Sequence, residues 1–123
     1  LWDGMPFCDI IDNLKTPTTI LVTGHAYSMG GYFLMAGYNN PNVTKKCFKH
    51  STALIHDGSI ELEGSNSKVK DTLKFTEQYE EQLKEYVLSH SKISARTYNQ
   101  KKRNEWFMDS AEMLKYGLVD EVI

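Results

Sequence analysis

A glycine-rich stretch, Gly-His-Ala-Tyr-Ser-Met-Gly-Gly, occupies residues 24–31 and joins two apolar segments of different character. Residues 18–23 are rich in β-branched side chains and predict a buried strand, whereas residues 32–36 are apolar and predict a helix. Ser28 therefore lies at a tight strand-to-helix turn, where the backbone N–H groups that open the helix favour an anion. A nucleophilic serine needs that setting, because acyl transfer develops an oxyanion. Glycine-rich junctions also bind phosphates or only pack tightly, so the turn alone leaves three interpretations open.

Length and composition indicate a single small globular domain. At 123 residues the chain can bury one modest core, and we expect residues 1–123 to form one domain. The hydrophobic content of 41% is ordinary, and no apolar run approaches the roughly 20 residues of a membrane span. The net charge of −2 gives no electrostatic case for nucleic acid or an anionic membrane as a partner.

The start of the chain and its cysteines bear on its origin. No signal peptide is visible, and because the chain opens at Leu1 without a methionine, we expect its N-terminal part to be missing. The two cysteines, Cys8 and Cys47, match no CxxC pattern. We expect free, buried thiols, which suits the reducing cytoplasm.

The predicted elements alternate between strands and helices with short connections. In chain order they are a helix opened by Pro6, a strand at 18–23, a helix ending near Gly37, a strand at 52–56, a long helix at about 68–89, a short helix opened by the capping box at 109–112, and a closing strand at 119–123. This order predicts an α/β chain built from βα units.

The long helix is nearly twice the usual length. Its apolar side chains recur at three- and four-residue steps, which places them on one face: Val69, Leu73, Thr76, Tyr79, Leu83, Tyr86 and Val87. Such a helix either projects to meet a partner or crosses the core, and the pattern does not decide between the two.

A serine nucleophile needs a base, and His56 is the best of the four histidines. It ends the apolar strand at 52–56, and functional residues of open α/β sheets gather at the carboxyl ends of strands. His25 lies in the turn before Ser28, on the wrong side for a linear relay. The alternative interpretation of His56 is a structural histidine with satisfied hydrogen bonds.

The acid that would orient the imidazole is less evident. Asp57 adjoins His56, but adjacent residues of a strand point to opposite faces, so Asp57 is a poor partner. Glu105 lies in a loop-like stretch, just before the capped helix, with aromatic neighbours that could shield a carboxylate. The alternative for Glu105 is a solvated acid in a charged segment.

Other chemistries have little support. The histidines lack HExxH spacing and the cysteines are isolated, so we expect no metal and no cofactor. A Walker-type GxxxxGK[ST] motif is absent, so the chain should not hydrolyse nucleotide itself. Two short basic clusters, at 45–49 and 101–103, lack the interleaved aromatics of a nucleic-acid surface.

Three segments carry a resemblance to one family. Residues 24–30 are similar to a G-x-A-x-S-M-G nucleophile turn, and residues 53–56, Ala-Leu-Ile-His, to a catalytic-histidine strand. Residues 107–123, with F-M-x-S-A-E followed by Y-G-L-V-D-E-V-I, are similar to a long, gap-free closing segment. Over essentially its whole length the chain resembles the proteolytic subunit of the Clp protease (ClpP), a serine peptidase with a crotonase-like fold of repeated ββα units.

The resemblance implies a role for each matching residue. Ser28 would be the nucleophile, His56 the general base, and the backbone N–H of Met29 one donor of the oxyanion hole. The family's aspartate stands two residues before the phenylalanine that matches Phe107, and here that residue is Glu105. Asn104 is the alternative, since an amide oxygen can also hold the imidazole tautomer.

The chain also departs from the family. The second oxyanion donor and the axial loops of the family lie upstream of the residue that matches Leu1, so this chain resembles the C-terminal two thirds of a subunit. The loop at 38–46 is somewhat longer than usual, and Tyr27 stands where a small residue is common, which would narrow the pocket. Together with Glu105, these features indicate a divergent or phage-type member.

The assembly that the resemblance implies is a homo-oligomer of two stacked seven-membered rings, a tetradecamer. The long helix resembles the handle helix through which the rings meet, within a handle region at about 58–100. Partners would be an AAA+ unfoldase and the polypeptide substrate that it feeds in with ATP, in the cytoplasm.

Two other functions compete with this one. Crotonase-type enoyl-CoA hydratases and isomerases share the fold, and residues 24–26 resemble their G-H-A turn. They use backbone N–H groups and glutamates, and they do not need Ser28 together with His56. The other alternative is a catalytically inactive ring subunit, which Glu105 and the missing N-terminal part keep open.

Overall fold

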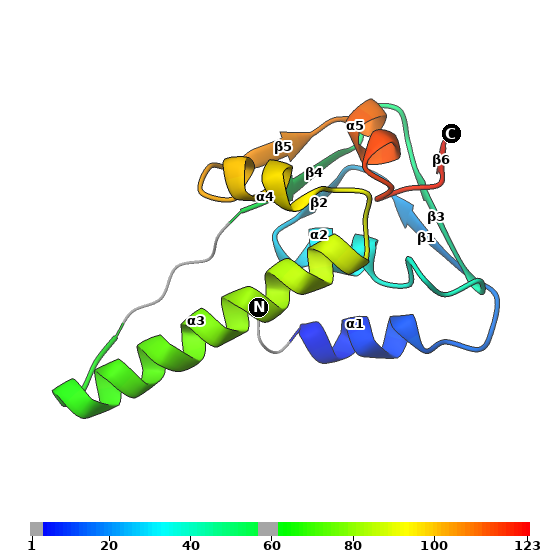
Figure 1. Cartoon of the computed structure of the whole chain (residues 1–123). Helices are drawn as coiled ribbons and strands as arrows, with labels where there is room; N and C mark the ends of the chain where they lie inside the picture. The colour runs from blue at the N-terminus through cyan, green and yellow to red at the C-terminus, as the bar shows by residue number, and fades with distance from the viewer. Residues whose placement is uncertain (1–3, 57–61) are drawn as a thin grey trace.

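The computed structural model describes residues 4–56 and 62–123. Two ββα units follow a first helix, α1 (Met5–Asp12), and Figure 1 shows their arrangement. The first unit is β1 (Thr18–Val22), β2 (His25–Tyr27) and α2 (Met29–Met35), and the second is β3 (Val43–Cys47), β4 (Thr52–Ile55) and α3 (Asn66–Ser89). The chain then adds α4 (Ala95–Lys101), β5 (Trp106–Met108), α5 (Ser110–Lys115) and β6 (Glu121–Val122). The expected α/β fold is confirmed.

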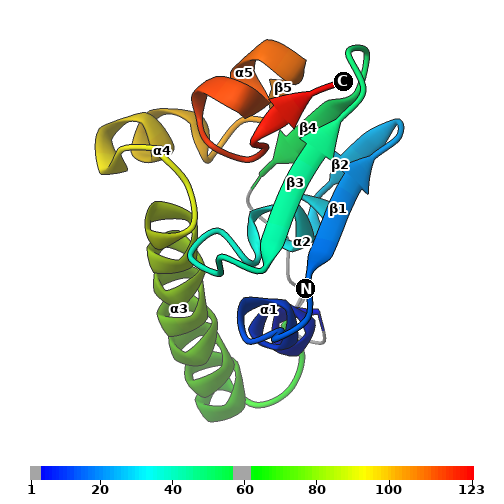
Figure 2. The ribbon, with the colours of Figure 1, turned by 90° about the vertical axis from the view of Figure 1, so that its right-hand side faces the viewer.

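Each unit contributes one strand to each of two three-stranded sheets. The first sheet has the order β1-β3-β6 and is parallel throughout. In the second sheet, of order β2-β4-β5, β2 and β4 are parallel and β4 and β5 are antiparallel. Figure 2 shows β1, β3 and β6 side by side. The parallel pairing of β2 with β4 matters for the site, because it brings the carboxyl ends of both strands to one edge.

Helix α2 is held close to the second sheet. Tyr32, Leu34 and Met35 are buried in the core beneath the strands. A Cβ at Gly31 would lie 3.1 Å from the carbonyl oxygen of Leu54, so only glycine allows this approach of helix to strand without a shift. The start of α2 is thereby fixed against the end of β4.

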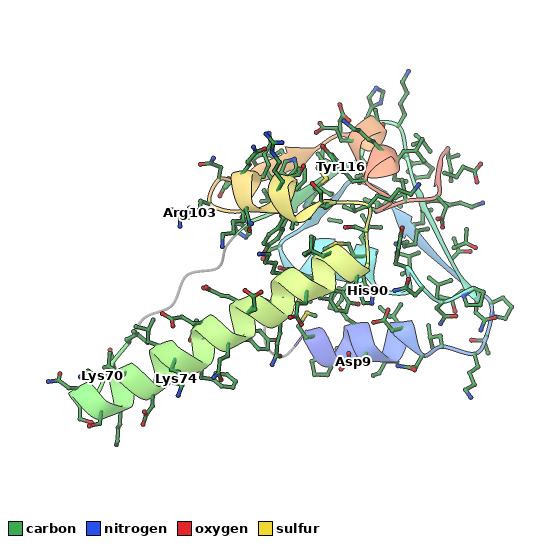
Figure 3. All side chains as sticks on the ribbon, in the orientation of Figure 1. Asp9, Lys70, Lys74, His90, Arg103 and Tyr116 are labelled. Atoms are coloured by element: carbon green, nitrogen blue, oxygen red, sulfur yellow. The ribbon has the colours of Figure 1, made fainter. Side chains whose placement is uncertain are left out.

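Helix α3 projects from the rest of the molecule (Figure 1). The apolar spacing of its residues allowed either a projecting helix or one that crosses the core, and the structure shows the projecting one. None of the first ten residues of α3 is buried, and its buried residues are Thr76, Leu83 and Val87. On the projecting part, Leu73 is 42% exposed and Phe75 is 51% exposed. Figure 3 shows Lys70 and Lys74 on the projecting part and His90 at the base of the helix. The first residues of the expected handle region, 58–61, lie outside the described residues.

Several boundaries differ from the sequence-based expectations. The predicted strand 18–23 ends at Val22, and residues 25–27, expected in a turn, form β2 in the other sheet. The closing strand is shorter than the predicted 119–123, because Val119 packs in the core and β6 begins only at Glu121. Besides β2, three elements were not predicted: β3, α4 and β5.

Candidate active site

Ser28 lies between the end of β2 and the start of α2, in an unusual backbone conformation. With φ 57° and ψ −114°, it is the one described residue other than glycine that has a positive φ. Such a conformation costs roughly 1–3 kcal/mol and persists only where the surroundings impose it. Two hydrogen bonds do so: the Ser28 N–H donates to the Leu54 carbonyl at 3.1 Å, and its own carbonyl accepts from the Gly31 N–H at 3.0 Å.

The Ser28 side chain is half-buried and does not cap the helix that it precedes. A serine at the N-cap of a helix commonly accepts a hydrogen bond from the N–H groups of the first turn, and here the Ser28 hydroxyl makes no such bond. The N–H of Met29, the first residue of α2, belongs to the N–H groups that have no acceptor within a helix. A free hydroxyl beside such a donor is the arrangement that acyl transfer requires.

His56 directly follows β4, as Ser28 directly follows β2. The register pairs Tyr27 with Leu54, so the residues that come next on both strands meet at the same edge of the sheet. The imidazole is 30% exposed. Among the described residues no hydrogen bond joins the Ser28 hydroxyl to the His56 ring, so the structure brings the two residues to one edge without closing that contact.

Glu105 directly precedes β5 and lies opposite His56, which directly follows β4. The antiparallel register pairs Ile55 with Trp106, and one residue further on this pairing brings His56 and Glu105 together. The distance from His56 Nδ1 to Glu105 Oε1 is 3.9 Å, which is an electrostatic contact rather than a hydrogen bond. Because the carboxylate faces Nδ1, the other ring nitrogen, Nε2, stays available to a serine.

The two other candidates for the acid are placed differently. The backbone N–H of Asn104 donates to the Lys101 carbonyl in the turn after α4, and the described contacts of His56 include Glu105 and not this amide. Asp57 lies outside the described residues. The structure therefore brings Glu105, and not Asn104, to the imidazole.

Two aromatic residues lie next to this edge. Tyr27 and Phe107 lie on the same face as His56 and Glu105, and their rings meet at 5.7 Å. Tyr27 was expected to narrow the pocket and Phe107 matched the family's closing segment, but a strand of three residues is too short for its outward face to be predicted from the sequence. The alternation of buried and exposed residues in Trp106–Met108 is the signal that indicates its outward orientation.

Within the part of the chain that the structure describes, no cluster of three or more His, Cys, Asp or Glu side chains is suited to a metal ion. Likewise, no described helix combines the length and apolar character needed to cross a membrane.

The fold defines an α/β protein of repeated ββα units, with a serine, a histidine and a carboxylate at one sheet edge. The sequence model of the Clp protease family matches residues 1–123. The chain therefore belongs to the Clp protease family, and the resemblance stated from its motifs is confirmed. The ATP-dependent Clp protease proteolytic subunit of Deinococcus radiodurans is 27% identical over 123 residues, which are 100% of this chain and 59% of that relative. The chain thus spans about three fifths of the length of this relative.

Proposed function

We propose that the chain acts as a serine endopeptidase, as the proteolytic subunit of an ATP-dependent, Clp-type protease that cleaves unfolded polypeptides. The observation that carries the proposal is the register of β2, β4 and β5, which collects Ser28, His56 and Glu105 at one edge of a sheet. Membership of the Clp protease family and the name of the Deinococcus relative agree with it.

In the first half-reaction, Ser28 Oγ attacks the carbonyl carbon of the scissile peptide bond. As this bond forms, the hydroxyl proton passes to Nε2 of His56, and the carboxylate of Glu105, facing Nδ1, stabilises the imidazolium. The oxyanion accepts a hydrogen bond from the N–H of Met29. His56 then gives its proton to the leaving amine as the C–N bond breaks, which leaves the acyl group on Ser28.

In the second half-reaction a water molecule takes the place of the leaving amine. His56 accepts a proton from this water while the water oxygen attacks the acyl carbon. The proton returns to Ser28 Oγ as the ester bond breaks, and the carboxylic acid product leaves. The serine, the imidazole and the carboxylate are then in their starting protonation states.

The resting geometry is looser than the reaction needs. Hydrogen bonding between His56 and Glu105 requires the 3.9 Å contact to shorten by about 1 Å. The Glu105 side chain is 64% exposed and has one methylene more than aspartate, so rotation of its own side chain can supply this movement. Catalytic hydrogen bonds are often long in the unliganded enzyme and tighten when substrate binds.

The proposal includes the assembly and partners of the family. The projecting part of α3 supplies an apolar surface, with Leu73 and Phe75 exposed, for contact between two seven-membered rings. An AAA+ unfoldase supplies ATP-driven delivery of the polypeptide. Both cysteines are free and buried, and burial raises the pKa of the Cys8 thiol to about 11, so a reducing, cytoplasmic location fits.

Family membership favours this function over the crotonase-type enoyl-CoA hydratase or isomerase. One observation favours a second candidate, the inactive ring subunit: the contact between His56 and Glu105 is longer than a hydrogen bond. In such an inactive subunit Ser28 and His56 are both present, but His56 does not activate Ser28.

Labelling with a fluorophosphonate, read by intact mass, tests the proposal on the full chain. We expect one adduct, absent from Ser28→Ala and from His56→Ala, because both the nucleophile and its base are needed. A protein that is assembled into rings and yet takes no adduct would instead be the inactive subunit.

A further inference from the structure

The two basic clusters of the sequence have different surroundings in the structure. In the cluster at 45–49, Lys45 is buried and Lys46 forms a 3.3 Å ion pair with Glu121. In the cluster at 101–103, by contrast, no side chain forms an ion pair or a hydrogen bond with any described residue. The second cluster is therefore a source of positive charge that the described chain does not neutralise.

This second cluster is held in a tight turn. Helix α4 ends at Lys101, and the Asn104 N–H donates to the Lys101 carbonyl at 3.1 Å, which closes the turn. The central residues are Lys102, whose N–H donates to the Tyr98 carbonyl at 2.8 Å, and Arg103. Lys101 lies in the last turn of α4, where a cation stabilises the helix dipole. We call Lys102 and Arg103 the basic turn; the first is half-buried and the second is exposed.

The basic turn lies beside the proposed catalytic pair. Arg103 precedes Glu105 by two residues, and Glu105 contacts His56 at 3.9 Å. Figure 3 shows Arg103 at the outer end of the turn, and Figure 1 shows this turn next to the end of β4, which His56 follows. Two residues of an extended chain span about 7 Å, so a ligand at this edge is within reach of the Arg103 side chain.

Glu105 does not neutralise the basic turn, although it is the nearest acid in the sequence. Its carboxylate contacts His56, and within the described residues it forms no ion pair with a lysine or an arginine. Residues 95–104 contain four basic and no acidic side chains, while the whole chain has a net charge of −2. The local field at this edge is therefore positive, and it attracts an anionic group from outside the chain.

We propose that the basic turn binds an acidic side chain of the polypeptide substrate, two or three residues from the scissile bond, and so favours substrates with aspartate or glutamate there. The inference rests on the proposed peptidase function. Charge complementarity identifies the occupant as an anion, and the position of the turn beside His56 identifies it as part of the chain that is cleaved. A carboxylate fits this site, because a guanidinium group can bind both of its oxygens.

Matched peptides on the full chain test the proposal. Quenched fluorescent peptides carry glutamate, glutamine or lysine at one position, two or three residues from the scissile bond, on its acyl side in one series and on its leaving side in the other. In one series we expect kcat/KM to be highest for glutamate and lowest for lysine. Glutamate should exceed glutamine by about 2- to 5-fold, the worth of an exposed ion pair. In about 1 M NaCl, where the Debye length is about 3 Å, the preference should disappear.

Reversing the charge of the basic turn should reverse the preference. In the double variant Lys102→Gln, Arg103→Glu, the lysine peptide should become a better substrate than the glutamate peptide, each measured relative to the glutamine peptide. Lys102→Gln avoids an acid at the C-terminus of α4, which the helix dipole disfavours. A change that only loosened the fold would slow all three peptides alike.

Lys49→Glu is the matched control. Lys49 is exposed and lies in the turn before β4, at the opposite end of that strand from His56. The variant should keep the parental order of the three peptides. A second measurement does not depend on turnover: the inert Ser28→Ala variant should bind the glutamate peptide more tightly than the glutamine peptide in fluorescence anisotropy. Adding the double variant of the basic turn should remove this difference.

The outcomes separate this inference from the proposed function. Parent protein that takes no fluorophosphonate fails the proposed function, and peptide binding by Ser28→Ala still decides the role of the basic turn. Equal kcat/KM for the glutamate and glutamine peptides in both series overturns the inference, and so does the parental order in the double variant. A changed oligomeric state of the double variant with the parental order also overturns it, because the basic turn then contacts another copy of the chain.

Discussion

Asp12 and His90 are joined by a 3.1 Å contact between Oδ2 of the carboxylate and Nε2 of the imidazole, although 78 residues separate them. Asp12 ends α1 and His90 is the C-cap of α3, so the contact ties the base of the projecting helix to the body. The same carboxylate accepts hydrogen bonds from the Gly37 N–H at 2.7 Å and from the Tyr86 hydroxyl at 3.0 Å. Burial raises the pKa of Tyr86, so its hydroxyl keeps the proton that it donates.

Replacing this carboxylate by an amide should loosen the base of α3. In Asp12→Asn the amide NH2 group faces donors from Tyr86 and His90, so at least one charge-assisted hydrogen bond is lost. We expect the free energy of unfolding in urea at pH 7 to fall by about 2 kcal/mol. Asp9→Asn, an exposed position on the same helix, is the matched control and should change it by less than about 0.5 kcal/mol. Equal effects at Asp12 and Asp9 would show that the carboxylate does not anchor the helix.

Lys45 provides a second prediction, because its ammonium group is buried in β3. The side chain is 1% exposed, and among the described residues Nζ has no hydrogen-bond partner. The Tyr38 ring lies 5.2 Å from Nζ and compensates in part. Burial lowers the pKa of Lys45 from 10.5 to about 8, although the nearby Asp120 carboxylate acts in the opposite direction.

This pKa makes stability depend on pH. Between pH 8 and 10.5 the unfolded chain holds the proton that the folded chain has released, so stability rises with pH across this window. The difference of 2.5 in pKa (10.5 − 8) corresponds to about 3 kcal/mol. Lys45→Met should therefore raise the free energy of unfolding at pH 7 and remove this part of the rise between pH 7 and 10.

Lys46→Met is the matched control for this measurement. Lys46 is the next residue of β3, its side chain is 34% exposed, and it forms a 3.3 Å ion pair with Glu121. The substitution should leave the pH dependence of denaturant unfolding as it is in the parent. If Lys45→Met were destabilising at pH 7 and kept the parental pH profile, the buried ammonium would have a stabilising partner.

Lys45 also shows why part of the fold could not be predicted from the sequence. The helices α1, α2, α3 and α5 and the strands β1 and β4 have periodic apolar side chains or distinct caps, and local patterns indicate them. Strand β3 does not, because two of its five residues, Lys45 and Lys46, are lysines and one of them is buried. A lysine is expected outside, so the alternation could not be recognised. Short elements such as α4 and β5 owe their structure to packing rather than to propensity.

The candidate site could likewise be predicted from the sequence only in part. His56 follows β4, which has a clear local signal, and the glycine-rich turn indicated Ser28 although β2 itself was not predicted. Both residues could therefore be proposed from the chain alone. The contact of Glu105 with His56 depends on the antiparallel register of β4 and β5, which joins residues about fifty positions apart. The aromatic neighbours of Glu105 made it a candidate and the family resemblance assigned it the role, but no local pattern encodes a register between distant strands.

The projecting part of α3 provides a third prediction. Phe75→Ser removes an apolar side chain that is 51% exposed, so the free energy of unfolding should change by less than about 1 kcal/mol. If this surface joins two rings, the same change should convert the larger assembly into single rings, as seen by native mass spectrometry. Leu114→Ser, on α5 and 43% exposed, is the control and should leave the assembly intact. Intact double rings in Phe75→Ser would place the contact elsewhere.

Glu105 provides the last prediction, since its carboxylate lies 3.9 Å from Nδ1 of His56. Without it, Nδ1 loses the group that stabilises the imidazolium and holds the tautomer with a free Nε2. We expect Glu105→Ala to slow fluorophosphonate labelling of Ser28 by about 10- to 100-fold, less than for a buried triad acid because this carboxylate is largely exposed. Glu105→Asp retains a carboxylate and should label at least tenfold faster than Glu105→Ala. Asn104→Ala is the matched control on the adjacent residue and should label at the parental rate. If Asn104→Ala were the slow variant instead, the amide would hold the imidazole in the reacting state, and the contact with Glu105 would belong to the resting state alone.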